Sequence, residues 1–342
     1  MALLELPPEL LCMILGCLGS EFFRQDVSRL AVSRKWYYFA RNSLLRDLRL
    51  SEISLRKFTS DEAILTLCKA HVSVVVISLE GHQNPNPLWT LEAGEISTNV
   101  PEPDEWTNEL NYSLEKLADM LRHAPGLRHL GLKAGPERPD LGWGREGYLM
   151  IKPLSDLLSM RHLTSLDFDI AGSYPRSRAC DLGIHLCRSI NALLPSLRRL
   201  RCRMDAVCED LLDPPTPDSY LLLKEVIVNL SLSELSDDIT SYRYPVCCTT
   251  ASSTTFLEMR DMLIDRATTL SQRLLNPQTV RVIWHELPSL TRYAWDAIAA
   301  QRIQLGPGTK WDAEGWVVDD VEQEDETDLF DSDSPSPPQI GF

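Results

Sequence analysis

The chain has 342 residues, of which 44% are hydrophobic and 24% charged, as is typical of a globular protein. Its net charge of −15 is uneven: residues 312–342 hold eleven Asp or Glu and no Lys or Arg, so the rest carries 49 − 11 = 38 acidic against 34 basic side chains, or −4. A nearly neutral body without a basic patch argues against nucleic acid as a partner. No apolar run approaches the roughly 18 residues of a membrane span.

The first fifty residues predict three short helices and then a strand. Pro7 and Pro8 fit a first helical turn, where a backbone N–H has no helical partner. The apolar residues that follow recur at helical spacing up to Gly19, which can end the helix. Asp26 can cap a second helix, residues 32–40 predict a third, and residues 44–50 alternate like a strand.

Residues in this segment resemble the F-box pattern in order and spacing: Leu6-Pro7-x-Glu9-Leu10, Ile14-Leu15, Leu18, Asp26, Leu30-x-Val32, Trp36 and Leu45-x-Asp47-Leu48. Two features depart from the pattern: Ser33 replaces the cysteine that often follows the position of Val32, and residues 19–25 lengthen the link after the first helix. This variant is similar to those common in fungal F-box proteins. Three helices in about 45 residues cannot build a self-sufficient core, so such a segment keeps apolar surface for a partner. The alternative is a plain helical cap on the next domain.

The resemblance implies that residues 1–50 dock on a Skp-type adaptor and, through it, on the cullin and RING subunits of a ubiquitin ligase. The residues that it assigns to adaptor binding are Leu6, Pro7, Glu9, Leu10, Ile14, Leu15, Leu18, Leu30, Val32 and Trp36.

Residues 60–305 repeat a unit of an amphipathic helix, a turn and an apolar strand. Helices are predicted at 61–70, 114–123, 154–160 and 182–194, and strands at 74–79, 127–132, 163–168, 197–202 and 223–228. The strand leucines at 127, 163, 197 and 223 are spaced 36, 34 and 26 residues apart, which favours an irregular leucine-rich-repeat-like array with long insertions. The alternative is an α/β domain in which helices and buried strands alternate.

Long loops are predicted at 85–105, 135–147 and 213–219, a long helix at 256–275 and a final strand at 280–284, while residues 231–255 give no clear pattern. The predicted fold class is therefore α/β: F-box helices (1–50), a leucine-rich-repeat-like domain (51–311) and a disordered acidic tail (312–342).

Side chains alternate along a strand, so residues between the leucines should line the open face of the sheet, where a protein target could bind. The candidate target-binding residues are Lys133, Asp167, Asp169, Arg199, Arg201 and Arg203. Aligning the strands by their first leucine predicts a charge ladder in which Asp169 lies between Lys133 and Arg203.

No motif predicts catalysis, a cofactor or a metal site. The sequence has no Gly-rich phosphate loop and no nucleophile elbow. Cys68 and His71 lack a second ligand pair, and His185 and Cys187 lie two apart in a predicted helix, where they would point to different faces. Nine cysteines at irregular spacing indicate a reducing compartment, the cytoplasm or the nucleus, rather than a disulfide framework.

The sequence thus predicts a non-enzymatic substrate receptor of a cullin–RING ubiquitin ligase, with an unidentified protein target and no nucleic acid or membrane partner. Two alternatives belong to other classes. One is a leucine-rich scaffold that recruits no ligase, and the other is a hydrolase, which would need a nucleophile, a base and an orienting acid converging in a pocket.

Overall fold

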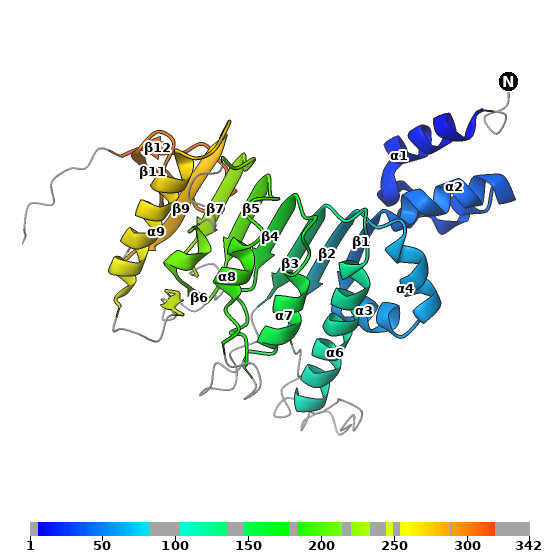
Figure 1. Cartoon of the computed structure of the whole chain (residues 1–342), viewed down its shortest axis with the longest axis horizontal. Helices are drawn as coiled ribbons and strands as arrows, with labels where there is room; N and C mark the ends of the chain where they lie inside the picture. The colour runs from blue at the N-terminus through cyan, green and yellow to red at the C-terminus, as the bar shows by residue number, and fades with distance from the viewer. Residues whose placement is uncertain are drawn as a thin grey trace, which may run out of the picture.

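The computed structural model of the chain describes residues 6–81, 103–135, 147–177, 183–213, 220–232, 244–248, 254–287 and 289–318 (Figure 1). Most of the loops predicted at 85–105, 135–147 and 213–219 lies outside these residues, as does residue 319 onward. In the described part of the chain, no helix is both long enough and apolar enough to cross a bilayer.

The N-terminal module consists of α1 (Pro8–Gln25), η2 (Val27–Leu30) and α2 (Arg34–Leu45). Gly19 has the non-helical angles φ 76° and ψ 172° and separates two helical segments within α1, so the predicted end of the first segment at Gly19 is confirmed, and a second segment runs on to Gln25. Asp26 accepts a hydrogen bond from the Ser28 N–H at 3.0 Å, as expected of a cap. Ser33 caps α2 by accepting from the Trp36 N–H at 3.1 Å. The chain therefore changes direction at two N-cap residues, Asp26 before η2 and Ser33 before α2.

A ten-stranded sheet forms the body of the molecule, so the predicted α/β class is confirmed. Its parallel strands, in spatial order, are β1 (Asp47–Ser51), β2 (Val74–Leu79), β3 (His129–Ala134), β4 (Ser165–Asp169), β5 (Arg199–Arg203), β7 (Glu225–Asn229) and β9 (Thr279–Glu286). Three antiparallel strands complete it: β10 (Thr291–Asp296), β11 (Gln301–Leu305) and β12 (Trp316–Val317). A separate parallel pair joins β6 (Ala206–Val207) to β8 (Val246–Cys247).

The helices that connect the strands lie along one face of the sheet (Figure 1). They are α3 (Glu52–Thr59), α4 (Glu62–Lys69), α6 (Pro103–Arg122), α7 (Ile151–Leu157), α8 (Leu186–Asn191), the short η4 (Glu209–Leu211) and α9 (Phe256–Ser271). The strand leucines point toward these helices: Leu130, Leu166 and Leu200 are fully buried in the same core as Leu114 of α6. Burial of the leucine side of each strand was predicted from the alternation.

An equivalent backbone contact recurs at the start of successive strands. In each case one carbonyl oxygen accepts two N–H groups from the next strand along; for example, Arg128 O accepts from Thr164 N at 2.8 Å and from Ser165 N at 3.0 Å. The acceptors in this row are Arg46, Ser73, Arg128, Thr164, Arg198 and Lys224. Each acceptor residue directly follows an apolar residue of the repeated pattern, so equivalent positions of the pattern lie side by side. The predicted alignment of the strands is therefore confirmed over residues 127–228.

Several predicted boundaries differ in the structure, and three of the differences change the account of the fold. Strand β1 begins only at Asp47, since α2 continues to Leu45. Helix α6 begins at Pro103, inside the predicted loop at 85–105. The strand predicted at 280–284 is not the last: β10, β11 and β12 follow it, so the sheet extends beyond residue 311, and residues 312–318 belong to the folded body. The mixed apolar and acidic composition of that last segment concealed the strand.

Candidate interaction surfaces

The N-terminal module exposes a row of apolar side chains on α1. Leu10, Ile14 and Leu18 follow one another at intervals of one helical turn and are 45%, 36% and 41% exposed. Met13 beside them is 65% exposed, and Val32, before α2, is 64% exposed. Pro7 and Glu9 are also exposed at the start of the helix, and Leu6 is half-buried. The exposed apolar side chains among them suit a docking surface.

Other residues assigned to adaptor binding are buried inside the module instead. Leu15, Leu30 and Trp36 form its small core together with Phe23 and Ala40. The Trp36 indole Nε1–H donates to the Arg29 carbonyl oxygen at 2.6 Å, which ties α2 to η2. Burial gives these three residues a supporting role, in which their side chains hold up the surface that the exposed residues form, and their part in adaptor binding stays a prediction.

The predicted charge ladder on the sheet is partly confirmed. Asp169 pairs in register with Lys133 on one side and with Arg203 on the other. The Arg203 guanidinium donates to both Asp169 carboxylate oxygens, at 2.9 and 2.7 Å. Among the ion pairs of the described residues, Asp169 pairs with Arg203 and not with Lys133, which is exposed. In the next row, the carboxylate of Asp167 lies 3.8 Å from both the His129 imidazole and the Arg199 guanidinium, and these replace the ion pair predicted with Arg201.

The C-terminal segment covers part of the face that was expected to be open. Trp311 lies over the Arg203 guanidinium, with 5.1 Å from the ring centroid to Cζ. Asp312 accepts from Arg201 at 2.6 Å, and Glu225 accepts from the same guanidinium. Arg203 is consequently only 6% exposed. A neighbouring segment of the same chain occupies Arg201 and Arg203 in this conformation, so their role in target binding stays a prediction that requires this segment to move away.

A hollow of about 380 Å³ remains between the sheet and this segment. Its lining includes His129, Lys133 and Asp167 from the strands and Trp311 from the covering segment. The pKa of His129 is lowered, first by desolvation and against the opposing effect of Asp167. His129 Nδ1 lies 2.9 Å from Ser165 Oγ. Lys133, which lies in this lining, is exposed.

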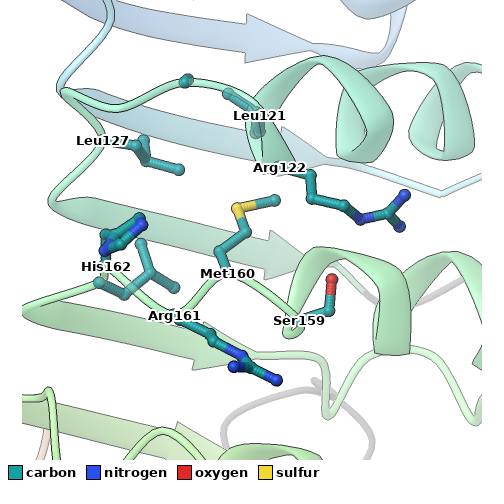
Figure 2. Close-up of a pocket in the computed structure, with 9 residues that line it drawn as sticks. Leu121, Arg122, Leu127, Ser159, Met160, Arg161 and His162 are labelled. Atoms are coloured by element: carbon teal, nitrogen blue, oxygen red, sulfur yellow. The ribbon is translucent and has the colours of Figure 1, made fainter.

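A groove of about 350 Å³ lies on the helix side, between the turns that follow α6 and α7 (Figure 2). Figure 2 shows Met160 at its centre, between Leu127 and the end of α6 that carries Arg122. The Ser159 hydroxyl, the one hydroxyl in the lining, donates to the Asp156 carbonyl oxygen at 2.7 Å. The lining thus contains no nucleophile paired with a base, and the groove is the junction between two successive units.

A serine–histidine pair exists elsewhere but is sealed in the core. Ser231 Oγ lies 3.1 Å from His285 Nδ1, and both residues are 0% exposed. Tyr244 stacks on the imidazole with 4.5 Å between ring centroids, and burial lowers the pKa of His285. His285 Nε2 has no hydrogen-bond partner among the described residues. In the part of the chain that the structure describes, this fully buried pair has no acid hydrogen-bonded to the imidazole, which the hydrolase alternative requires.

The structure also assembles a cluster that the sequence did not predict. His185, Cys187, Cys208 and Cys248 place their potential ligand atoms within 4.8 Å of one another. The prediction that His185 and Cys187 point to different faces of one helix is wrong. Helix α8 begins only at Leu186, and His185, the N-cap residue of α8, has an extended backbone. The thiols of Cys187 and Cys248 hydrogen-bond to Cys208 and lower its pKa to about 3.

Sequence spacing could not reveal this cluster, because its members are up to 63 residues apart. The one local signal was the His-x-Cys pair itself at 185–187. Comparison with known proteins identifies no relative: the chain matches no family model and no curated protein.

Proposed function

We propose that this protein is a substrate receptor of a cullin–RING ubiquitin ligase, in which the N-terminal module binds a Skp-type adaptor and the sheet domain binds a protein target. The observation that carries the proposal is the apolar row Leu10, Ile14 and Leu18, exposed on a small module that resembles an F-box. A module with a core of five buried residues gains from covering such a row with a partner.

The sheet domain supports the second half of the proposal. Its helices lie along one face (Figure 1), whereas a doubly wound α/β domain carries helices on both. The recurrent carbonyl row favours a repeat array related to leucine-rich repeats, whose free face is a common place for protein recognition. The exposed Lys133 and its surroundings are the proposed target-binding region. Such a receptor needs no catalytic site of its own and would act in the cytoplasm or the nucleus.

Adaptor capture tests the proposal directly. Changing Leu10 and Ile14 together to Asp places charges in the apolar row and should abolish co-purification with a Skp-type adaptor and a cullin. Each buried anchor at an interface contributes about 2 kcal/mol, or roughly a thirtyfold change in affinity. Both side chains are at least 36% exposed, so the melting temperature of the chain should hardly change.

Ile53→Asp is the matched control, because Ile53 on α3 is 67% exposed and lies outside the module. The control should keep full adaptor capture. If the double variant still captures the adaptor, the module does not dock through this row. If even the unchanged chain captures neither adaptor nor cullin, the scaffold alternative without ligase recruitment is favoured.

A further inference from the structure

Three cysteines and one histidine converge where α8 meets the small β6–β8 pair. Figure 1 shows α8 and β6 next to each other. His185 precedes α8 and Cys187 lies in its first turn. Cys208 directly follows β6, and Cys248 directly follows β8. Cys187 and Cys208 are each 1% exposed. The four side chains thus come from three separate segments of the chain and meet in its interior.

The β6–β8 pairing explains why two of these cysteines are neighbours. Ala206 pairs with Val246 and Val207 with Cys247, so the residues that follow in the two parallel strands lie side by side. Val246 N donates to Asp205 O at 2.8 Å, and Cys248 N donates to Val207 O at 3.3 Å. A parallel ladder of two residues per strand is too short to be stable alone. Beyond this ladder, Tyr244 stacks on Phe256 and His285 at one end of residues 244–248, and the cluster lies at the other end, at Cys248.

The distances within the cluster match those between the ligands of a tetrahedral zinc ion. The sulfurs of Cys187 and Cys248 are 3.6 Å apart. His185 Nε2 lies 3.0 Å from the Cys248 sulfur and 3.6 Å from the Cys208 sulfur. Zinc bond lengths imply about 3.8 Å between two sulfur ligands and about 3.5 Å between sulfur and nitrogen. Small side-chain movements would therefore complete the tetrahedron.

The histidine is oriented as a zinc ligand would be. Its Nε2 atom faces the sulfurs, while Nδ1 on the other side is buried and has no hydrogen-bond partner among the described residues. The Asp210 carboxylate lies 3.9 Å from Nδ1 and is held by Arg188 Nε at 2.8 Å. When such a carboxylate comes within hydrogen-bonding distance of Nδ1, it fixes the tautomer that leaves Nε2 free for the metal.

We propose that His185, Cys187, Cys208 and Cys248 bind a structural zinc ion that fastens residues 244–248 to α8 and the body of the domain. Thiolates and an imidazole suit zinc and are poor ligands for magnesium or calcium. Four protein ligands fill the tetrahedron, so no position remains for water or substrate, and the site is structural rather than catalytic. Thiols that bind the ion give up their protons to solvent, and the imidazole binds in its neutral form.

Metal analysis of the full-length chain tests the proposal. The purified, reduced chain should contain one zinc ion by elemental analysis and by native mass spectrometry. After chelation, refilling with Co²⁺ should give the strong visible absorption of tetrahedral cobalt with thiolate ligands. Cys208→Ser and Cys248→Ser should each reduce zinc affinity by at least about a hundredfold, and Asp210→Asn by about tenfold to a hundredfold.

Cys247→Ser is the matched control, since Cys247 is the neighbour of Cys248 but lies outside the cluster. It should retain one zinc ion per chain. Because a ligand variant could also fail to fold, a second measurement uses the unaltered chain. Zinc should protect Cys187, Cys208 and Cys248 from alkylation, while Cys12, which is exposed on α1, should react equally with and without zinc.

Two results would overturn the proposal. One is a reduced, folded chain that contains no zinc and takes up none when zinc is offered. The other is zinc binding that persists in both ligand variants, which would place the ion elsewhere. A disulfide between Cys187 and Cys248 in the isolated chain would favour a redox pair instead if the reduced form then failed to bind zinc. None of these results depends on adaptor binding.

Discussion

At the scale of single residues, burial decides which charges on the sheet face stabilise the fold. The side chains of Arg203 and Asp169 are 7% and 18% exposed and share two hydrogen bonds. Those of Arg122 and Asp119 are 44% and 71% exposed at a distance of 3.3 Å. The Arg203–Asp169 pair has little contact with water, so the loss of one partner leaves a buried charge without compensation. In the Arg122–Asp119 pair, water can replace either partner.

Arg203→Met should therefore lower the free energy of unfolding by about 3 kcal/mol or more, because it leaves the Asp169 carboxylate without its partner. Urea unfolding of the full-length chain measures the change. Asp119→Asn, in the exposed pair, should alter stability by less than about 1 kcal/mol. Adding Asp169→Leu to Arg203→Met should restore most of the loss. Equal effects of the two single changes would mean that Arg203 is not buried in solution.

The alignment of this pair could be predicted from the sequence, but its burial could not. The spacing of the strand leucines fixes which residues share a row, and rows are a local consequence of strand geometry. What covers a row depends on segments far away in the chain: Trp311 and Asp312 are more than 100 residues from Arg203 and Arg201. The same reason hid the His–Cys cluster, because the β6–β8 pairing and α8 bring its members together from distant parts of the sequence.

At the scale of elements, α1 owes its shape to one glycine. Gly19 has φ 76° and ψ 172°, a conformation that L side chains rarely adopt, and it separates the exposed apolar row from the part of α1 that carries Phe23. The sequence indicated a helix end at Gly19 but not the second helical segment. Resumption of the helix depends on Phe23 entering the small core with Trp36, which is a tertiary contact.

Gly19→Ala should destabilise the module by about 1–3 kcal/mol, because alanine is strained at this backbone conformation even though no atom lies within 4 Å of the added Cβ. Gly16→Ala is the matched control: this glycine lies inside the helix, and its Cβ would have only an ordinary contact at 3.8 Å with Arg46. Hydrogen exchange resolved over residues 8–45 should be faster in the first variant and unchanged or slower in the second. Similar exchange in both variants would argue against the break at Gly19.

At the scale of the whole molecule, the repeated pattern was the strongest signal in the sequence. Successive strands each carry the same apolar spacing, so several weak local indications agree on one parallel sheet. The antiparallel strands β10, β11 and β12 lie outside that pattern. Side chains of β10 and β11 build a second small core with Ile227 of β7 and Ile283 of β9, apart from the main core under the helices. A prediction based on repeats alone therefore missed how the array ends.

Two truncations test where the fold ends. Removal of residues 319–342 should change the melting temperature by no more than a few degrees, because this acidic, Ser- and Pro-containing sequence can bury little apolar surface. Removal of 310–342 also takes away Trp311, Asp312 and the Ala313 carbonyl oxygen that accepts from Arg281 at 2.7 Å. It also removes β12.

The longer truncation keeps Arg201, Arg203 and Arg281 on the sheet but removes these contacts. Each buried polar group that loses its partner lowers the free energy of unfolding by about 1–3 kcal/mol. We therefore expect its melting temperature to fall by at least about 5 °C. Differential scanning calorimetry of the full-length chain and both truncations makes the comparison. If the shorter truncation already lowers the melting temperature by that much, the acidic tail packs on the body. If the longer one has no effect, residues 310–318 do not cover the sheet, and Arg201 and Arg203 return as candidates for target binding.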